Sequence, residues 1–261
     1  MKFLDATLPT PAENLACDEA LLDLCQKERV EILRLWESRQ HFVVAGYGNR
    51  VEHEVNVDEC SRRGVPILRR CSGGGTVVQG PGCLNYNVTL RIPEGGPLAT
   101  VTGTNEFVME RNRAAFEELL GLKVSVQGHT DLAFASLAPT TVPTSGEYKS
   151  RKYDDETHWL KFSGNAQRRR RRALVFHGTC LYNFDLNLIE ALLRFPSAPP
   201  EYRAHRSHTR FVRNIPALAH SIRAALQRAW NANEPFTHPP HHQITQLVQD
   251  QYANADWNLR R

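Results

Sequence analysis

Residues 66–90, PILRRCSGGGTVVQGPGCLNYNVTL, contain two predicted strands with three consecutive glycines between them. β-Branched and aromatic residues favour an extended conformation in the second strand, residues 83–90. Without side chains at Gly73, Gly74 and Gly75, a ligand can lie against the backbone, whose N–H groups can bind an anion. Taken alone, such a stretch is more often a tight loop. It lacks the Gly-Lys-Ser/Thr ending of a P-loop and the glycine spacing of a dinucleotide site.

Elements on both sides of this segment predict a mixed fold. Apolar spacing indicates helices at residues 11–29, 55–63, 105–120, 216–232 and 243–252. Strands are expected at residues 31–38, 41–48, 123–127, 131–134, 158–167 and 173–183. We expect the first two of these strands to be neighbours in a sheet, and the last two to form a hairpin with the arginine run 168–172 at its tip. The fold class is therefore α+β (α/β), a mixed, largely antiparallel sheet flanked by helices, because strands often follow one another without a helix between them.

Length and composition bound the class of protein. A chain of 261 residues can bury one large core, so we expect a single domain, 1–261, with a helical C-terminal segment 216–261. The acidic opening and the lack of a long apolar stretch predict a soluble, cytoplasmic protein that does not bind a membrane. Six scattered cysteines without a C-x-x-C pair indicate reduced thiols. The net charge of +4 comes largely from one arginine run, which argues against a nucleic-acid partner.

Residues 160–167, LKFSGNAQ, place a lysine beside a gap of small residues. Lys161 can supply a positive charge to a phosphoryl or carbonyl oxygen as negative charge develops there. The residues alone leave open a second interpretation, an exposed lysine on a strand.

Several segments resemble lipoate-protein ligases and octanoyltransferases, and occur in the order that this family shows. RRCSGGGTVVQGPGCLNY (69–86) is similar to the RRxSGGGxVxHxxGNLN-type signature, and WLKFSGNAQ (159–167) resembles GRKxSGxAQ. FHGTCLYNFDL (176–186) is similar to HHGTxLxNxDL, and NLACDEALL (14–22) resembles the start of the family. DLAF (131–134) resembles its NDL element. The resemblance implies the catalytic fold that this family shares with biotin-protein ligases.

The resemblance also implies roles for individual residues. Lys161 is the expected catalytic residue, in contact with both the acyl carbonyl and the α-phosphate, and Asp131 is expected to help place Mg²⁺ or the adenylate. The other residues expected to bind the nucleotide and the acyl chain are Arg70, Ser72, Gly73, Gly74, Gly75, Thr76, Val77, Val78, Gln79, Asn85, Gly164, Asn165, Ala166, His177, Gly178 and Thr179.

The implied reaction has two steps. Lipoate or octanoate attacks the α-phosphate of ATP in the presence of Mg²⁺ and releases pyrophosphate. A lysine of a lipoyl-domain carrier, such as the glycine cleavage H protein or the E2 of a 2-oxoacid dehydrogenase, then attacks the acyl-adenylate and releases AMP. Positioning and electrostatics can do most of this work without a protein nucleophile.

Departures from the family pattern keep two alternatives open. Gln79 stands where the family has histidine or tyrosine, and Cys83, Phe176 and Thr130 replace residues of its motifs. The chain stops about where ligases continue into a small C-terminal accessory domain, so we expect either a separate accessory subunit or activation without one. The first alternative is an octanoyltransferase that takes its acyl group from acyl carrier protein through a cysteine thioester. The second is a non-catalytic protein that binds acyl-adenylates or nucleic acid.

Overall fold

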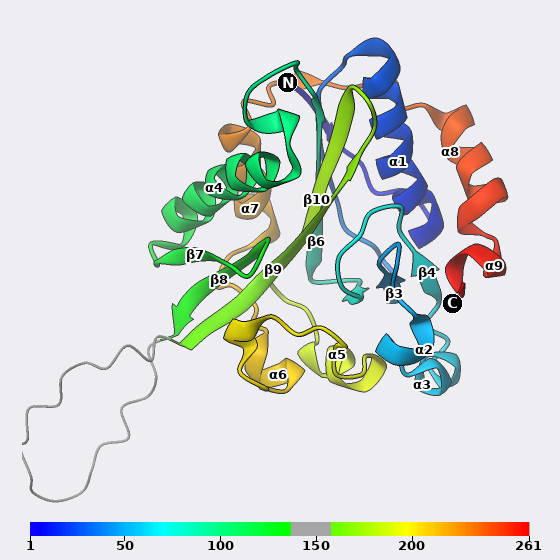
Figure 1. Ribbon diagram of the computed structural model, residues 1–261, viewed down its shortest axis with the longest axis vertical. Helices are drawn as coiled ribbons and strands as arrows, with labels where there is room; N and C mark the ends of the chain where they lie inside the picture. The colour runs from blue at the N-terminus through cyan, green and yellow to red at the C-terminus, as the bar shows by residue number, and fades with distance from the viewer. Residues whose placement is uncertain (137–157, 261) are drawn as a thin grey trace, which may run out of the picture.

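The computed structural model describes residues 1–136 and 158–260. Two sheets form its centre (Figure 1). The large sheet has the strand order β11-β1-β2-β6-β10-β9-β8-β7, and the small sheet has the order β4-β3-β5. The pairs of β1 with β2 and β11, and of β3 with β4, are parallel, and the other pairs are antiparallel. The predicted mixed, largely antiparallel sheet is confirmed.

The strands and helices have the following bounds. The strands are β1 Lys2–Asp5, β2 Ile32–Trp36, β3 Phe42–Ala45, β4 Ile67–Arg69, β5 Val77–Gln79, β6 Cys83–Arg91, β7 Val124–Gln127, β8 Asp131–Ser136, β9 His158–Arg169, β10 Ala173–Leu181 and β11 Glu234–Pro235. The α-helices are α1 Pro11–Glu28, α2 Val51–Glu54, α3 Val57–Arg62, α4 Val101–Leu120, α5 Leu186–Leu192, α6 His208–Phe211, α7 Ala219–Ala229, α8 His241–Leu247 and α9 Ala255–Asn258. Short helical turns add η1 Pro97–Ala99, η2 Glu201–Arg203 and η3 Val248–Tyr252.

Helices cover both faces of the large sheet (Figure 1). Strand β6 alternates between the two faces, as the two-residue period of a strand requires. Its apolar residues Leu84, Tyr86, Val88 and Leu90 pack with α4 and α7 in one core. Its polar residues Asn85, Asn87 and Thr89 are also buried, and α1 contacts β6. The interface between α1 and the sheet is therefore partly polar.

Helix α1 begins where the sequence predicts. Thr10 and Glu13 form a capping box, in which each side chain accepts a hydrogen bond from the other residue's backbone N–H. Such caps typically stabilise a helix by about 1 kcal/mol. The helix also buries the acidic residues Asp18 and Glu19.

Two predictions about neighbouring elements were wrong. Strands β2 and β3 are not neighbours: β2 pairs with β1 and β6, whereas β3 lies in the small sheet. The arginine run does not all lie at the hairpin tip, because Arg168 and Arg169 belong to β9. After α7, the short strand β11 extends the sheet beside β1.

The segment after α8 returns to the small sheet and secures β4. The fully buried Arg69 donates hydrogen bonds to the carbonyls of Gly46 (2.7 Å) and Asn49 (2.8 Å). It also donates to the carbonyls of Trp257 (3.0 Å) and Arg260 (2.8 Å). One side chain thereby joins the loop after β3 to residues almost 200 positions later in the chain.

No helix in the described part of the chain is long and apolar enough to cross a membrane.

Candidate active site

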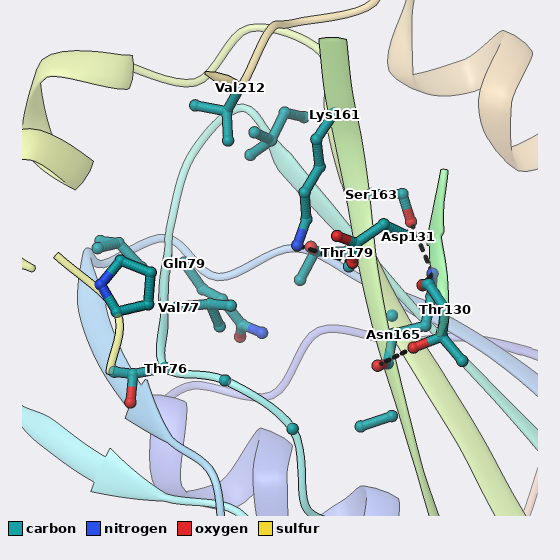
Figure 2. A pocket seen from close by; sticks show the side chains of 18 of the residues that line it. Thr76, Val77, Gln79, Thr130, Asp131, Lys161, Ser163, Asn165, Thr179 and Val212 are labelled. Atoms are coloured by element: carbon teal, nitrogen blue, oxygen red, sulfur yellow. Dashed lines mark hydrogen bonds and ion pairs between the residues drawn. The ribbon is translucent and has the colours of Figure 1, made fainter. Parts of the chain in front are cut away.

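A pocket of ≈ 690 Å³ is lined by residues from both sheets. Its size lies within the range of small-molecule sites. One side is formed by the glycine-rich loop, defined here as residues 70–76, and by β5. The other side is formed by β8, β9, β10 and the segment 193–212. Figure 2 shows Lys161, Asp131, Gln79 and Thr179 around this space.

Lys161 enters the pocket from β9 and forms an ion pair with Asp131 of β8. Its Nζ lies 2.8 Å from Asp131 Oδ1, and the lysine side chain retains 24% of its exposure. The other carboxylate oxygen, Oδ2, accepts a hydrogen bond of 2.8 Å from the Tyr202 hydroxyl. Burial and the Asp131 charge raise the pKa of Tyr202, so the hydroxyl remains a donor. The carboxylate thus holds the ammonium group in a defined place.

A β-bulge accounts for the direction of Lys161. In the pairing of β8 with β9, Leu132 faces Ser163 but the next residue, Ala133, faces Lys161, so one residue of β9 has no partner. Bulges of this kind redirect side chains and are frequent beside active sites. Gly164 follows, and a Cβ atom there would lie 3.1 Å from Lys161 Nζ. Glycine at 164 therefore leaves room for the ammonium group.

Asn165 joins three strands beneath this pair. Its Nδ2 donates to the Thr130 carbonyl at 2.6 Å, and Thr130 Oγ1 donates to the Asn165 carbonyl at 2.8 Å. The Tyr86 hydroxyl of β6 donates to Asn165 Oδ1. A Cβ atom on Gly178 would overlap Asn165 Oδ1, so glycine is required there. Asn165 fixes the strand that carries Lys161.

Arg70 binds the glycine-rich loop through that loop's own carbonyl groups. Its Nη2 donates to Gly73 O at 2.6 Å and to Gly75 O at 2.7 Å, and its Nε donates to Ser72 Oγ at 3.1 Å. Burial lowers the pKa of Arg70 to about 10, which leaves it protonated at neutral pH. The guanidinium therefore shapes the loop, and backbone groups of the loop face the pocket.

A chain of polar contacts extends from this loop to α1. Ser72 Oγ lies 2.5 Å from His177 Nε2, and His177 Nδ1 lies 3.6 Å from Asp18 Oδ2. Arg34 Nη1 donates to Asp18 Oδ1 at 2.6 Å. We call these residues, together with Arg70, the glycine-loop network.

The order Ser72, His177, Asp18 matches that of a hydrolase triad, but Ser72 is completely buried and accepts a bond from Arg70. Its hydroxyl is therefore not presented as a nucleophile. Burial raises the pKa of Asp18, but Arg34 and His177 more than offset that effect and hold it below its ordinary value. The network thus keeps the buried Asp18 carboxylate in its charged form.

The deep part of the pocket contains polar groups without protein partners. Gln79 and Trp36 both line it and are more than nine-tenths buried. Within the described residues, Gln79 Oε1 and Trp36 Nε1 have no hydrogen-bond partner. Figure 2 shows the Gln79 amide directed into the open space. A ligand or water is therefore needed to satisfy these groups.

None of the six cysteines lines the pocket as the structure describes it, and all six are buried. Burial raises the pKa of each thiol, to about 11 for Cys17 and about 12 for Cys25 and Cys83. The same direction holds for Cys60, Cys71 and Cys180. Reactive cysteines need a lowered pKa and access to solvent. These thiols have neither property.

The role of Asp131 as a Mg²⁺ ligand does not fit its surroundings. One oxygen is paired with Lys161 and the other accepts from Tyr202. Among the residues that the structure describes, no cluster of three or more histidine, cysteine or carboxylate side chains could hold a metal ion. The carboxylate acts instead on the lysine.

The pocket gathers most of the residues that the sequence singles out. Arg70, Gly74 to Gln79, Asn85, Asp131, Lys161, Gly164 to Ala166 and His177 to Thr179 all line it. Ser72 and Gly73 of the same loop are not part of the described lining. The sequence motifs do not indicate Asp18, Trp36 or Glu54, which also line the pocket, or any residue of the arginine- and histidine-rich stretch 202–208. The structure places Arg203 and His208 of that stretch in the wall.

Comparison with known proteins identifies the family of this chain. The model of the lipoyl protein ligase A/B catalytic domain family matches residues 10–232. The chain belongs to this family. It is therefore an enzyme of the lipoate ligase and octanoyltransferase group, as the motifs predict.

Curated relatives of this enzyme fall into both branches of the family. A putative lipoate-protein ligase A from Aeropyrum pernix is 29% identical over 232 residues, which cover 88% of this chain and 74% of the relative. An octanoyltransferase LipM from Brevibacillus brevis is 26% identical over 290 aligned positions, covering 100% and 99% of the two chains. Sequence similarity alone thus leaves both activities open.

Solved structures confirm the fold. A structure of a bi-partite lipoate protein ligase and its E2 lipoyl domain from Thermoplasma acidophilum superimposes with a TM-score of 0.78 at 23% identity. The match covers 100% of this chain and 97% of that one. A lipoate-protein ligase A bound with ATP gives a TM-score of 0.74 at 24% identity and covers 99% and 98% of the two chains.

Proposed function

We propose that this enzyme is an ATP-dependent lipoate-protein ligase. It activates lipoate or octanoate as an acyl-adenylate and transfers the acyl group to a lysine of a lipoyl carrier domain, such as an H protein or an E2 component. The observation that carries the choice is the absence of an activated thiol: no cysteine lines the described pocket, whereas a lysine held by a carboxylate does. An octanoyltransferase with a thioester intermediate needs a thiolate in contact with its acyl group. The segment 137–157, which lies outside the described residues, contains no cysteine.

The residues support adenylation by position and charge. The acyl carboxylate attacks the α-phosphate of ATP, and pyrophosphate leaves. Lys161, fixed by Asp131, supplies a positive charge where negative charge develops on the phosphoryl and carbonyl oxygens. The glycine-rich loop, shaped by Arg70, presents backbone groups on the opposite side. The carrier's lysine amine then attacks the acyl carbonyl, forms the amide, loses a proton and releases AMP.

The likeness to a bi-partite ligase supports a separate accessory subunit. The similar protein from Thermoplasma acidophilum is bi-partite, and this chain covers 97% of the matching chain. We therefore propose that residues 1–261 form one catalytic domain that works with a second subunit. Six free cysteines fit a reducing compartment, and we place the reaction in the cytoplasm.

The test measures acyl transfer to a purified lipoyl domain by mass spectrometry. The wild-type chain receives Mg²⁺-ATP and either lipoate or octanoate, and a parallel reaction receives octanoyl-acyl carrier protein without ATP. We expect an ATP-dependent mass gain, reduced about 100- to 1000-fold in Lys161→Ala. Pyrophosphate release in the absence of carrier reports adenylation separately, so a missing second subunit is recognised as activation without transfer.

Two results would replace the proposal. Transfer from octanoyl-acyl carrier protein but not from the free acids would identify an octanoyltransferase. Binding of both ligands without pyrophosphate release or transfer would favour a non-catalytic binding protein.

A further inference from the structure

Arg203, at the end of η2, is a buried arginine in the wall of the pocket. It retains 3% of its exposure and lines the space that Lys161 also enters. The rings of Phe195 and Phe211 lie 4.5 and 5.0 Å from its Cζ atom. The two residues that follow, Ala204 and His205, have φ angles of 48° and 57°. Aromatic packing and a tight left-handed turn thus hold this side chain in place.

Its hydrogen bonds are incomplete. Nε donates to the Arg206 carbonyl at 2.8 Å. Neither terminal nitrogen has a hydrogen bond to any residue in the described ranges, and Nη2 is fully enclosed without a partner. No carboxylate in those ranges forms an ion pair with Arg203. Burial of a guanidinium is costly and lowers the pKa of Arg203, and the charge of Glu190 offsets only part of that effect without forming an ion pair.

Arg206, three residues later, shows what a structural arginine in this segment looks like. Its guanidinium donates to the carbonyls of Arg203 (2.9 Å), Trp159 (3.1 Å) and Tyr202 (2.8 Å). All three nitrogens of Arg206 are therefore used within the protein. In the part of the chain that the structure describes, Arg203 is not satisfied in this way, which points to a ligand as its partner.

The charges around Arg203 indicate what that partner is. Lys161 lies in the same pocket, and both Lys161 and Arg203 act on His208, whose pKa is lowered first by burial and then by Arg203. The carboxylate nearest to Lys161, Asp131, is already paired with it. Glu190 offsets part of the positive charge felt by Arg203 and His208, and a ligand anion can balance the remainder.

We infer that Arg203 is an anion-binding residue whose guanidinium holds a phosphoryl or carboxylate group of a ligand in the pocket. The planar guanidinium matches both groups, since each offers two oxygens to a pair of N–H donors. The inference rests on the proposed function only in assigning the anion to the nucleotide or to the acyl acid. The inferred contact would also explain why the chain keeps a buried, unpaired charge beside a catalytic lysine.

The test separates the two sources of the anion by isothermal titration calorimetry on the full chain. The probes are α,β-methylene-ATP, inorganic pyrophosphate and octanoate, and the proteins are wild type, Arg203→Met, Arg203→Lys and the exposed control Arg210→Gln. We expect Arg203→Met to weaken one class of probe by about 10- to 100-fold, because a charged hydrogen-bonding group is lost. Arg203→Lys should recover part of the affinity, and Arg210→Gln should remain within about twofold of wild type on the same scale.

Thermal unfolding of the ligand-free proteins separates a binding role from a structural one. Loss of an unpaired buried charge should leave the melting temperature of Arg203→Met at or above that of wild type. Weaker phosphate binding assigns the site to the nucleotide, and weaker octanoate binding assigns it to the acyl acid.

Three results would overturn the inference: unchanged affinity for all probes in Arg203→Met, no binding of any probe by wild type, or melting several degrees lower in both the Met and Lys variants. Anion binding that depends on Arg203 in a chain that transfers no acyl group would instead refute the proposed function alone.

Discussion

The two sides of the pocket use their arginines differently. On the glycine-rich side, Arg70 bonds to loop carbonyls and Arg34 pairs with Asp18, although Arg34 Nε has no partner among the described residues. On the other side, neither terminal nitrogen of Arg203 has a partner in the described ranges, and Lys161 has a single carboxylate partner there. The charges of the first side are thus paired within the fold, and those of the second leave room for a ligand anion. Substitutions should therefore lower stability on the first side and activity on the second.

The largest effect is expected for Arg34→Met in the glycine-loop network. The substitution leaves Asp18 buried without its main partner, which should lower the free energy of unfolding by about 3–5 kcal/mol. Urea unfolding followed by circular dichroism measures this loss. The control is Arg223→Met, which breaks a more exposed ion pair with Asp5 and should cost about 1 kcal/mol or less. Equal losses in the two variants would contradict the distinction between the two sides.

Asp131→Asn tests the opposite side. The amide no longer holds the Lys161 ammonium by charge, and a small displacement of a catalytic group can cost up to about 100-fold in rate. We expect kcat to fall about 10- to 100-fold, with a change in unfolding free energy near 1 kcal/mol, the scale of one hydrogen bond. Tyr202→Phe keeps the ion pair and should affect kcat less. An Asp131→Asn variant with a clearly lower free energy of unfolding but a normal kcat would contradict the role of Asp131 in activity.

Acidic pH should destabilise the folded protein by protonating Asp18 of the glycine-loop network. The pKa of this carboxyl is lower in the folded protein than its ordinary value of 3.8, with Arg34 and His177 facing it. Its stabilising contribution is therefore complete above that value and is lost as the pH falls through the folded-state pKa. Urea midpoints measured between neutral pH and pH 3 should show this decline, and Arg34→Met should show less of it. A decline of the same size in the variant would assign the acid sensitivity to other groups.

Modification of thiols should have the smallest effect. Because all six cysteines are buried and their pKa values are raised, brief treatment of the native enzyme with iodoacetamide should leave activity unchanged. Mass spectrometry counts the modified thiols, and the urea-unfolded chain provides the positive control. Rapid inactivation by modification of one thiol would favour the octanoyltransferase function over the ligase function.

The sequence predicted the strands and Lys161, but it did not predict how the strands pair or which residue Lys161 contacts. The glycine-rich loop, the β9–β10 hairpin and Lys161 were recognisable because their residues lie close together in the chain. The ion pair with Asp131 depends on a bulge whose position follows from pairing between strands, which local patterns do not encode. The assignment of β3 to the small sheet failed for the same reason, since an apolar strand does not specify its neighbour.

The sequence also did not reveal the contributions of Asp18 and Arg203 to the pocket. Asp18 lies in the first turns of a helix, where an acidic residue is ordinary, and only the placement of Arg34 opposite it reveals a buried pair. Arg203 lies in an irregular segment with several prolines, for which periodicity predicts no direction of the side chain.

The contacts of Arg69 with Trp257 and Arg260 bear on the order of events during synthesis. The small sheet that supports the glycine-rich loop is fastened by residues made almost 200 positions later. Contacts so distant in sequence close a large loop, so they form late and slow the overall folding. While the chain is still on the ribosome, the large sheet can assemble from β1 to β10, but the base of the glycine-rich loop lacks these bonds until residues 257–260 emerge. The nascent enzyme should therefore gain its central sheet before it gains a finished ligand site.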